Sequence, residues 1–390
     1  MAAPDTLNSF LIIFSGAAVI ATAALFTRQP MLIAYILLGL VVGPHGVSLI
    51  QDTGELQNIA EIGIIFLLFL VGLDLPPAKL KNLLEESLLT ALGTSIIFFV
   101  ATGGIMLLAG FQPLEAFVAG LAMTFSSTIL GIKLLPTTAL HHRHIGELVI
   151  SLLLIQDLLA IFAILILGHL GTQQASEPLD LVLIILGLPV LILGAYQVMQ
   201  RLIVPLIARF DDFHEYVFLL AIGWCLACAE VAHLMGLSYE IGGFIAGVAL
   251  ATNPIAKYIA EHLKPLRDFF LIIFFFTVGA ALNISLLQVA WLPALALALT
   301  LVMLKPWTFY WLLKGQGEEP ETAKEVGFRL GQGSEFSLML SYIAISGGLI
   351  GDSAALVIQG ATVLTLVLSS YWVVSRYPSP IAARPELRRD

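Results

Sequence analysis

The stretch Ile150-Ser-Leu-Leu-Leu-Ile-Gln156-Asp157-Leu-Leu-Ala-Ile-Phe162 places one carboxylic acid in the middle of an apolar helical segment. An ionisable side chain this deep in an apolar segment costs free energy and marks a functional site by default. The alternative interpretation is a structural carboxylate held by a buried lysine. The depth of Asp157 favours a functional role.

The composition around this stretch indicates a membrane protein. Of the 390 residues, 59% are hydrophobic and 12% are charged, whereas a soluble domain carries about 25% charged residues. One globular core cannot hide so many apolar side chains, because a folded surface needs polar cover. The sequence therefore predicts an all-α polytopic membrane protein, with a bilayer around its apolar surface.

Apolar runs separated by polar breaks predict 13 transmembrane helices. The spans near Leu38 and Gly247 are short and rich in glycine. The predicted span centres are Ser15, Leu38, Leu67, Ile97, Thr124, Leu158, Leu191, Cys225, Gly247, Phe276, Leu299, Ser334 and Leu364.

The basic residues predict the orientation of these spans. With the N-terminus outside, every Lys and Arg except Lys305 and Arg329 falls in an inner loop or in the C-terminal tail. This segregation follows the positive-inside rule. The sequence thus predicts a multi-pass protein of the cell inner (plasma) membrane with a cytoplasmic C-terminus. The inner basic residues are Arg28, Lys79, Lys81, Lys133, Arg143, Arg201, Arg209, Lys257, Lys264, Arg267, Lys314, Lys324, Arg376, Arg384, Arg388 and Arg389.

Two similar halves follow one another along the chain. The run Tyr35-Ile-Leu-Leu-Gly39-Leu-Val-Val-Gly43 resembles Tyr239-Glu-Ile-Gly-Gly243-Phe-Ile-Ala-Gly247, and the run ending in Val71-Gly72 resembles the one ending in Val278-Gly279. The offsets are 204 and 207 residues, or seven predicted spans, so the halves have opposite orientations. Inverted repeats are typical of secondary transporters, whose sites lie near the midplane.

Matching polar breaks interrupt one span in each half. Thr124, Ser126, Ser127 and Thr128 interrupt the first, and Gly331-Gln-Gly-Ser-Glu335 interrupts the second. Such centres indicate unwound helices whose carbonyl groups can coordinate a cation. The alternative is two intact helices whose hydroxyl groups bond back to the preceding turn.

Three further charged residues lie inside predicted spans. Lys305, which precedes Pro306, is expected either to neutralise the C-terminal ends of half-helices or to pair with Asp157. Glu335 is expected to offset the positive ends of half-helices. Arg329 is expected to extend its side chain to the inner surface.

The other polar clusters favour ordinary roles. His141, His142, Arg143 and His144 suit a solvated basic loop, and Cys225 and Cys228 suit helix packing. The sequence contains no nucleotide loop, zinc-binding pair or nucleophile-with-base pattern. We therefore expect no enzyme activity, no cofactor, no metal beyond a transported monovalent cation, and no nucleic-acid partner.

Motifs along almost the whole chain resemble the cation:proton antiporter-2 family, and within it the Kef-type potassium:proton antiporters. The most specific are Gln156-Asp157 and Gly331-Gln-Gly-Ser-Glu335-Phe336. The other matching pieces are Gly39-Leu-Val-Val-Gly43-Pro44, Phe69-Leu-Val-Gly72-Leu-Asp74, Ser126-Ser127-Thr128, Gly243-Phe-Ile-Ala-Gly247, Phe275-Phe-Thr-Val-Gly279 and Lys305.

The resemblance implies a sodium/proton antiporter-like fold with two crossed, discontinuous helices, a homodimer and elevator-like alternating access. It maps a dimerisation part to about 7–75 and 214–284, and an ion-translocating core to about 86–169 and 288–376. The segment of about 179–209 would be a linker helix. Kef-type proteins often continue into a cytoplasmic nucleotide-binding domain, which these residues do not include, so regulation by nucleotide or glutathione is not carried over. A separate cytoplasmic regulatory subunit is left open.

The function expected from residues and resemblance is exchange of K⁺ for H⁺ in pH homeostasis. Asp157 would be the shared carboxylate, and Gln156, Ser126, Ser127 and Thr128 would complete the ion site, with Lys305 and Glu335 as electrostatic support. Because Gln156 cannot carry a proton through the cycle, the exchange is expected to be electroneutral. The alternatives are a Na⁺/H⁺ antiporter, a gated cation channel, and the membrane subunit of a sensor or assembly.

Overall fold

The structure is a computed structural model that describes residues 3–27, 29, 31–50, 54–73, 77–135, 144–171, 178–210, 213–235, 237, 239–282, 287–379 and 386. Several residues considered above lie outside the described part. They are Arg28, Asp74, His141, His142, Arg143, Arg384, Arg388 and Arg389, together with the side chains of Lys79, Lys81 and Lys133.

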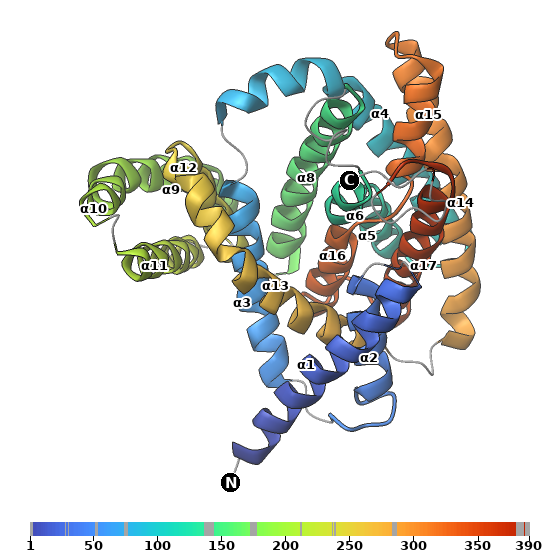
Figure 1. The fold of residues 1–390 in the computed structure, drawn as a ribbon, viewed down its shortest axis with the longest axis horizontal. Coiled ribbons are helices and arrows are strands. Elements are labelled where there is room, and N and C mark those ends of the chain that lie inside the picture. The colour runs from blue at the N-terminus through green and yellow to red at the C-terminus, as the bar shows by residue number, and fades with distance from the viewer. Residues whose placement is uncertain are drawn as a thin grey trace. The chain divides into compact units, whose positions relative to one another are not determined.

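Every regular element in the described ranges is a helix, which confirms the all-α class (Figure 1). In chain order they are α1 (Ala3–Phe26), α2 (Met31–Val42), α3 (Gly54–Leu73), α4 (Pro77–Leu108), α5 (Pro113–Met123), α6 (Thr128–Lys133), α8 (His144–Gly171), α9 (Pro178–Val198), η1 (Met199–Ile203), α10 (Val204–Arg209), α11 (His214–Leu234), α12 (Tyr239–Ala251), α13 (Ile255–Ala281), α14 (Leu287–Gly315), α15 (Pro320–Arg329), α16 (Glu335–Ser346) and α17 (Asp352–Arg376).

Among the described residues, eight helical segments are long and apolar enough to cross a membrane. Four shorter apolar helices accompany them, namely α2, α5, α12 and α16. The short spans expected near Leu38 and Gly247 correspond to α2 and α12. The number of 13 spans stays a prediction.

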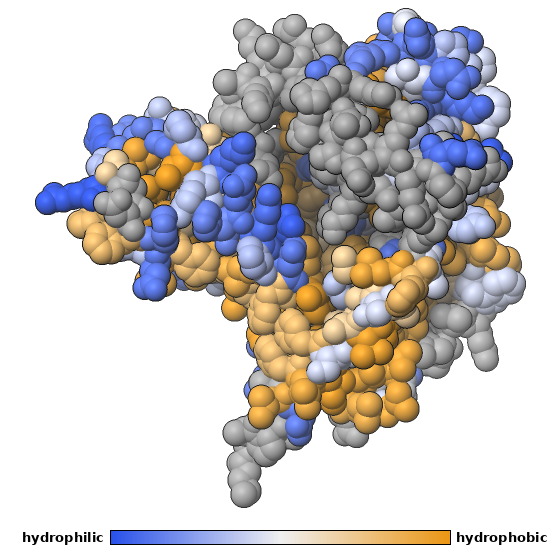
Figure 2. Space-filling model, viewed as in Figure 1, coloured by the Kyte–Doolittle hydropathy of each residue, from blue (hydrophilic) through white to orange (hydrophobic). Residues whose placement is uncertain are grey.

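The surface of α1 and α2 has the character expected beside lipid. On the face drawn in Figure 2, apolar side chains gather over these two helices. Leu7, Leu11 and Val19 of α1 are all exposed. Exposing a patch of neighbouring apolar side chains to water costs free energy, whereas contact with lipid hydrocarbon does not.

Local sequence explains where the short helices begin. Pro113 occupies the first turn of α5, where its missing N–H costs no hydrogen bond. The backbone N–H of Gln112 donates to Glu115 Oε2 at 3.0 Å, which satisfies one group left over at the helix start. Ser334 caps α16, because its Oγ accepts a hydrogen bond from the N–H of Phe336 at 3.1 Å.

The chain divides into two compact units. The first comprises residues 1–51, 83–167 and 278–390, and the second comprises 52–82 and 168–277. Except for its residues 168 and 169, the predicted ion-translocating core falls inside the first unit. The assignment of a dimerisation part, a core and a linker stays a prediction.

The repeated glycines occupy equivalent contacts within the two units. In the second unit, α3 meets α12 at Gly72 and Gly247, where a Cβ added to either residue would lie 3.0 Å from the Cα of the other. In the first unit, the end of α13 meets α2, and a Cβ added at Gly279 would lie 2.0 Å from the carbonyl oxygen of Ile36. Glycines matched by the repeat thus make matched helix crossings, as small residues do in membranes.

These crossings predict which glycines tolerate alanine. We expect Gly247→Ala and Gly279→Ala each to lower the free energy of unfolding by about 1–3 kcal/mol, because backbone atoms cannot move aside for the new methyl group. Gly223→Ala on α11 is the matched control, since nothing lies within 4 Å of a Cβ at that position. The midpoint of thermal unfolding in detergent measures the effect, and midpoints at or above the parent's for both variants would contradict the crossing geometry.

Candidate ion-binding site

The first polar break is a real interruption of a helix. Helix α5 ends at Met123 and α6 begins at Thr128. The hydroxyl of Thr124 bonds back to the carbonyl of Gly120 at 2.9 Å, as in an intact helix, but Phe125, Ser126 and Ser127 leave the helical path.

The second break matches the first. Helix α15 ends at Arg329 and α16 begins at Glu335, with five non-helical residues between them. The two discontinuous helices expected from the sequence are therefore confirmed, and the alternative of two intact helices is wrong. Helices α5, α6 and α16 lie together beside α8 in Figure 1.

Hydroxyl groups join the two broken helices where they cross. Ser126 Oγ donates to the carbonyl of Leu330 at 2.8 Å. Ser337 Oγ donates to the carbonyl of Ala122 at 2.6 Å. Each break leaves backbone carbonyl groups without their helical hydrogen bonds, and the bilayer core contains no water to replace them. A serine from the other broken helix therefore supplies the missing donor.

The charged ammonium group of Lys305 forms hydrogen bonds to both breaks. Its Nζ donates to the carbonyl of Phe125 at 2.6 Å and to the carbonyl of Gln332 at 3.0 Å, and the residue is 0% exposed. Both carbonyls follow the C-terminal ends of half-helices, where partial negative charge collects. The Phe98 ring covers the ammonium group at 5.1 Å. These contacts are the ones expected for the neutralising role, and no ion pair joins Lys305 to Asp157 among the described residues. The role itself stays a prediction.

Asp157 lies on α8 beside the first break. The hydroxyl of Thr128, the first residue of α6, is 2.9 Å from both Oδ1 and Oδ2 of the carboxylate. Asp157 is 6% exposed, so solvent reaches it only slightly. The Asp157 carboxylate and the Thr128 hydroxyl together present oxygen atoms, the ligand type that hard cations take.

Gln156 holds the break from the neighbouring position on α8. Its Oε1 accepts a hydrogen bond from the N–H of Ser126 at 3.0 Å, and the residue is 0% exposed. Its Nε2 has no hydrogen-bond partner among the described residues. A buried amide in this condition is unusual and marks a place where a bound group can lie.

The remaining predicted site residues lie within the same region. Ser127 caps α6, because its Oγ accepts from the N–H of Leu130 at 3.1 Å. Glu335 is 5% exposed and lies in the first turn of α16, where a carboxylate stabilises the positive end of a helix. The structure thus gathers Asp157, Gln156, Thr128 and Ser126 at the first break, and the ion-binding role of each stays a prediction.

The sequence interpretation missed the support that α17 gives to the second break. Thr365 Oγ1 accepts from the N–H of Gly333 at 2.8 Å, and Ser369 Oγ donates to Gln332 Oε1 at 3.0 Å. Both side chains are buried. The signal was a polar row, Thr362, Thr365 and Ser369, recurring at helical spacing in an apolar span.

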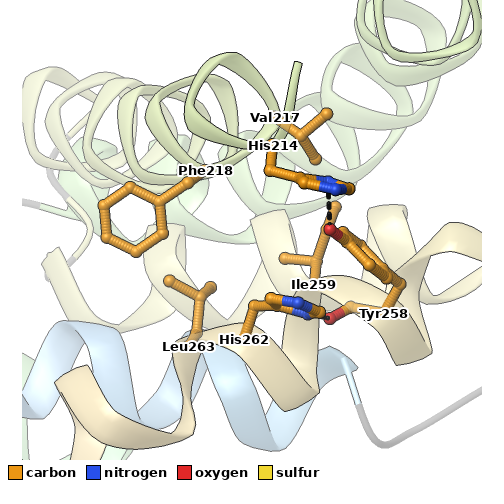
Figure 3. A pocket seen from close by; sticks show the side chains of 7 residues that line it. All are labelled: His214, Val217, Phe218, Tyr258, Ile259, His262 and Leu263. Carbon is orange, nitrogen blue, oxygen red and sulfur yellow. Dashed lines mark hydrogen bonds between the residues drawn. The ribbon is translucent and has the colours of Figure 1, made fainter. Parts of the chain in front are cut away.

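A pocket elsewhere has different chemistry. It lies in the second unit between α11 and α13, where His214 Nδ1 and the hydroxyl of Tyr258 form a hydrogen bond and His262 contacts the Tyr258 carbonyl (Figure 3). No carboxylate lines it. It contains none of the residues predicted for the ion site.

Comparisons with known proteins place these features in a family context. The family model described as "Sodium/hydrogen exchanger, transmembrane" matches residues 11–375. In Arabidopsis thaliana, K(+) efflux antiporter 6 is 29% identical over 352 residues, covering 87% of this chain and 58% of that protein. K(+) efflux antiporter 4 is 30% identical over 351 residues with the same coverages. The chain spans about three-fifths of the length of these curated relatives.

A solved structure shares the fold. The sodium proton antiporter MjNhaP1 from Methanocaldococcus jannaschii, determined at pH 8, matches with a TM-score of 0.68 over 93% of this chain and 95% of that one, at 20% identity. This likeness confirms the expected antiporter-like fold. Together the matches confirm the family resemblance that the sequence motifs indicated.

The contacts of Lys305 predict a large cost for its removal. We expect Lys305→Gln to lower the free energy of unfolding by about 2–4 kcal/mol, because buried carbonyl groups lose their donor and the half-helix ends lose their counter-charge. Lys314→Gln, at the exposed end of α14, is the matched control. Thermal unfolding in detergent provides the measurement. A stable Lys305→Gln protein that moves a different charge per cycle would instead make Lys305 a proton carrier.

Proposed function

Because this chain belongs to the transmembrane sodium/hydrogen exchanger family, we propose that it is a secondary active antiporter. It would exchange a monovalent cation for a proton. The observation that carries the proposal is Asp157, a buried carboxylate in the middle of α8 that contacts Thr128 at a helix break. This chemistry is transport and not enzyme catalysis.

The exchange follows from competition at one carboxylate. When Asp157 is protonated it loses the charge that attracts a cation, and when a cation binds, its charge disfavours protonation. Thr128 supplies a neutral oxygen ligand beside the same carboxylate. Each ligand therefore displaces the other, and alternating access converts that displacement into coupled movement across the bilayer.

K⁺ is the cation that we propose. The support is that relatives covering 87% of this chain are named K(+) efflux antiporters. Na⁺ is the alternative, because the fold neighbour is a sodium proton antiporter. A gated channel is the second alternative, and it would conduct without proton counterflow.

We further propose a homodimer in the cell inner (plasma) membrane, with the N-terminus outside and the C-terminus cytoplasmic, that works by an elevator-like movement and contributes to pH homeostasis. The orientation rests on the distribution of Lys and Arg. The elevator movement has one structural support: both breaks, Asp157 and Lys305 belong to a single compact unit. A moving unit of this kind would carry its ion with it.

Asp157→Asn tests the shared carboxylate. The substitution keeps the shape of the side chain but removes its charge and its titration, so we expect cation-driven proton flux in reconstituted vesicles to fall at least 100-fold, below detection. An imposed K⁺ gradient, compared with Na⁺, Rb⁺ and Li⁺ gradients, gives the flux and its selectivity. Asp268→Asn is the matched control, because that side chain is 62% exposed. Substantial flux in a folded Asp157→Asn protein would refute the proposal.

The glutamine side chain at position 156 does not titrate, so we expect electroneutral exchange of one cation for one proton. If Asp157 is the only group that changes its charge, the loaded site has the same net charge in both half-cycles. The membrane potential, worth about 2.3 kcal/mol per charge per 100 mV, would then leave turnover unchanged. Flux in vesicles with a clamped potential measures this directly, and a rate that shifts with potential at fixed ion gradients would contradict electroneutrality.

Gln156→Asp should change that behaviour. A second carboxylate beside the first would titrate with it as a coupled pair. We expect the pH optimum to shift and voltage dependence to arise, whereas Gln316→Asp on the exposed turn after α14 should leave both unchanged. A Gln156→Asp protein that matches its parent in both respects would show that Gln156 lies outside the ion site.

A further inference from the structure

Arg329, the last residue of α15, is buried although it carries a charge. It is 1% exposed, so the side chain does not reach the inner surface as the sequence interpretation expected. Burying a guanidinium group costs several kcal/mol unless hydrogen bonds and a counter-charge compensate. The hydrogen-bond partners of Arg329 therefore indicate the role of its buried side chain.

The partners of Arg329 come from three different segments. Its Nε and Nη2 donate to Glu325 Oε1 at 2.9 and 2.6 Å, one turn earlier on α15. Its Nη1 donates to the carbonyl of Leu134 at 2.8 Å, directly after α6. Its Nη2 also donates to the carbonyl of Pro378 at 2.8 Å, just after α17. The five N–H donors of a planar guanidinium group can reach all three of these acceptors.

Two consecutive residues of the second broken helix thus hold both ends of α6. At one end, Ser126 Oγ donates to the carbonyl of Leu330. At the other end, the carbonyl of Leu134 accepts from Arg329. Thr128, which contacts Asp157, lies between these two attachments. A helix of six residues makes few internal hydrogen bonds, so external attachments decide where it lies.

We propose that Arg329 is a positioning residue for cation binding, which acts by fixing α6 so that the Thr128 hydroxyl faces the Asp157 carboxylate. The proposal rests on the exchange function proposed above. Glu325 holds the guanidinium in place, and the Pro378 contact connects the segment after α17 to the same group. Loss of the guanidinium frees one end of α6 and displaces an ion ligand without touching the ion.

The test compares Arg329→Gln, Arg329→Lys and Thr128→Val in reconstituted vesicles, with Arg376→Gln as the matched control. Arg376 also lies near the end of α17, where it stacks on the Trp372 ring at 4.5 Å. We expect Arg329→Gln to raise the half-saturating K⁺ concentration about tenfold, because small displacements of a ligand are costly. Arg329→Lys should recover part of this loss, and Arg376→Gln should match the parent.

The half-saturating concentration separates positioning from simple stability. It does not depend on how much protein is folded, so a purely structural role would lower the maximal rate and the unfolding temperature while leaving it unchanged. If Arg329 acts through Thr128, the double variant Arg329→Gln, Thr128→Val should bind K⁺ no more weakly than the weaker single variant. An unchanged half-saturating concentration, or effects that multiply fully, would overturn the proposal.

A second measurement keeps this test independent of the exchange reaction. Amide hydrogen exchange of residues 126–134 in the full chain should speed up in Arg329→Gln, and stay at the parent's rate in both Arg376→Gln and Thr128→Val. If the parent shows no cation-driven proton flux, the proposed function fails, and faster amide exchange in Arg329→Gln alone would still show that Arg329 fixes α6. Unchanged amide exchange would overturn the positioning role whatever the flux.

Discussion

The hydrogen bonds from the Lys305 ammonium group to the carbonyls of Phe125 and Gln332 hold the interrupted region together. Breaking two helices inside a bilayer leaves carbonyl groups with no water to bond, and it brings two negative half-helix ends close to each other. The buried Lys305 ammonium group donates to two of these carbonyls and offsets the negative charge of both half-helix ends. Without it, the crossing of the two extended segments would be unstable, and the backbone groups around Asp157 would not stay in place.

A buried glutamine side chain lies at each of the two breaks. Gln156 accepts a hydrogen bond from Ser126 N–H, and Gln332 accepts one from the Ser369 hydroxyl, while neither Nε2 has a partner among the described residues. Gln156 thus fixes the backbone of the first break and Gln332 connects the second break to α17, while both keep spare donors. Unpaired buried donors are costly, so each of these amides marks a position where a bound group can lie.

Outside the breaks, helices pack closely at glycine residues. Helices α3 and α12, and likewise the end of α13 with α2, approach at glycine positions so closely that an added methyl group would overlap backbone atoms. In a membrane, the hydrophobic effect does not drive helices together, and close backbone contact takes its place. The same duplicated motif therefore makes a close crossing in each unit, whereas in the interrupted helices the duplicated position is polar.

The sequence by itself determined the membrane class, the helical class, the repeated glycine motifs and the two interruptions, because each depends on composition or on local spacing. It also selected Asp157 and Lys305, since a charge in an apolar span is visible without a fold. Only the tertiary structure decided which carbonyl groups Lys305 contacts, that Arg329 is buried against Leu134 and Pro378, and that Thr365 and Ser369 support the second break. Those roles depend on hydrogen bonds between segments up to about two hundred residues apart, and local sequence does not encode the direction in which a carbonyl group or a side chain points once the helices pack.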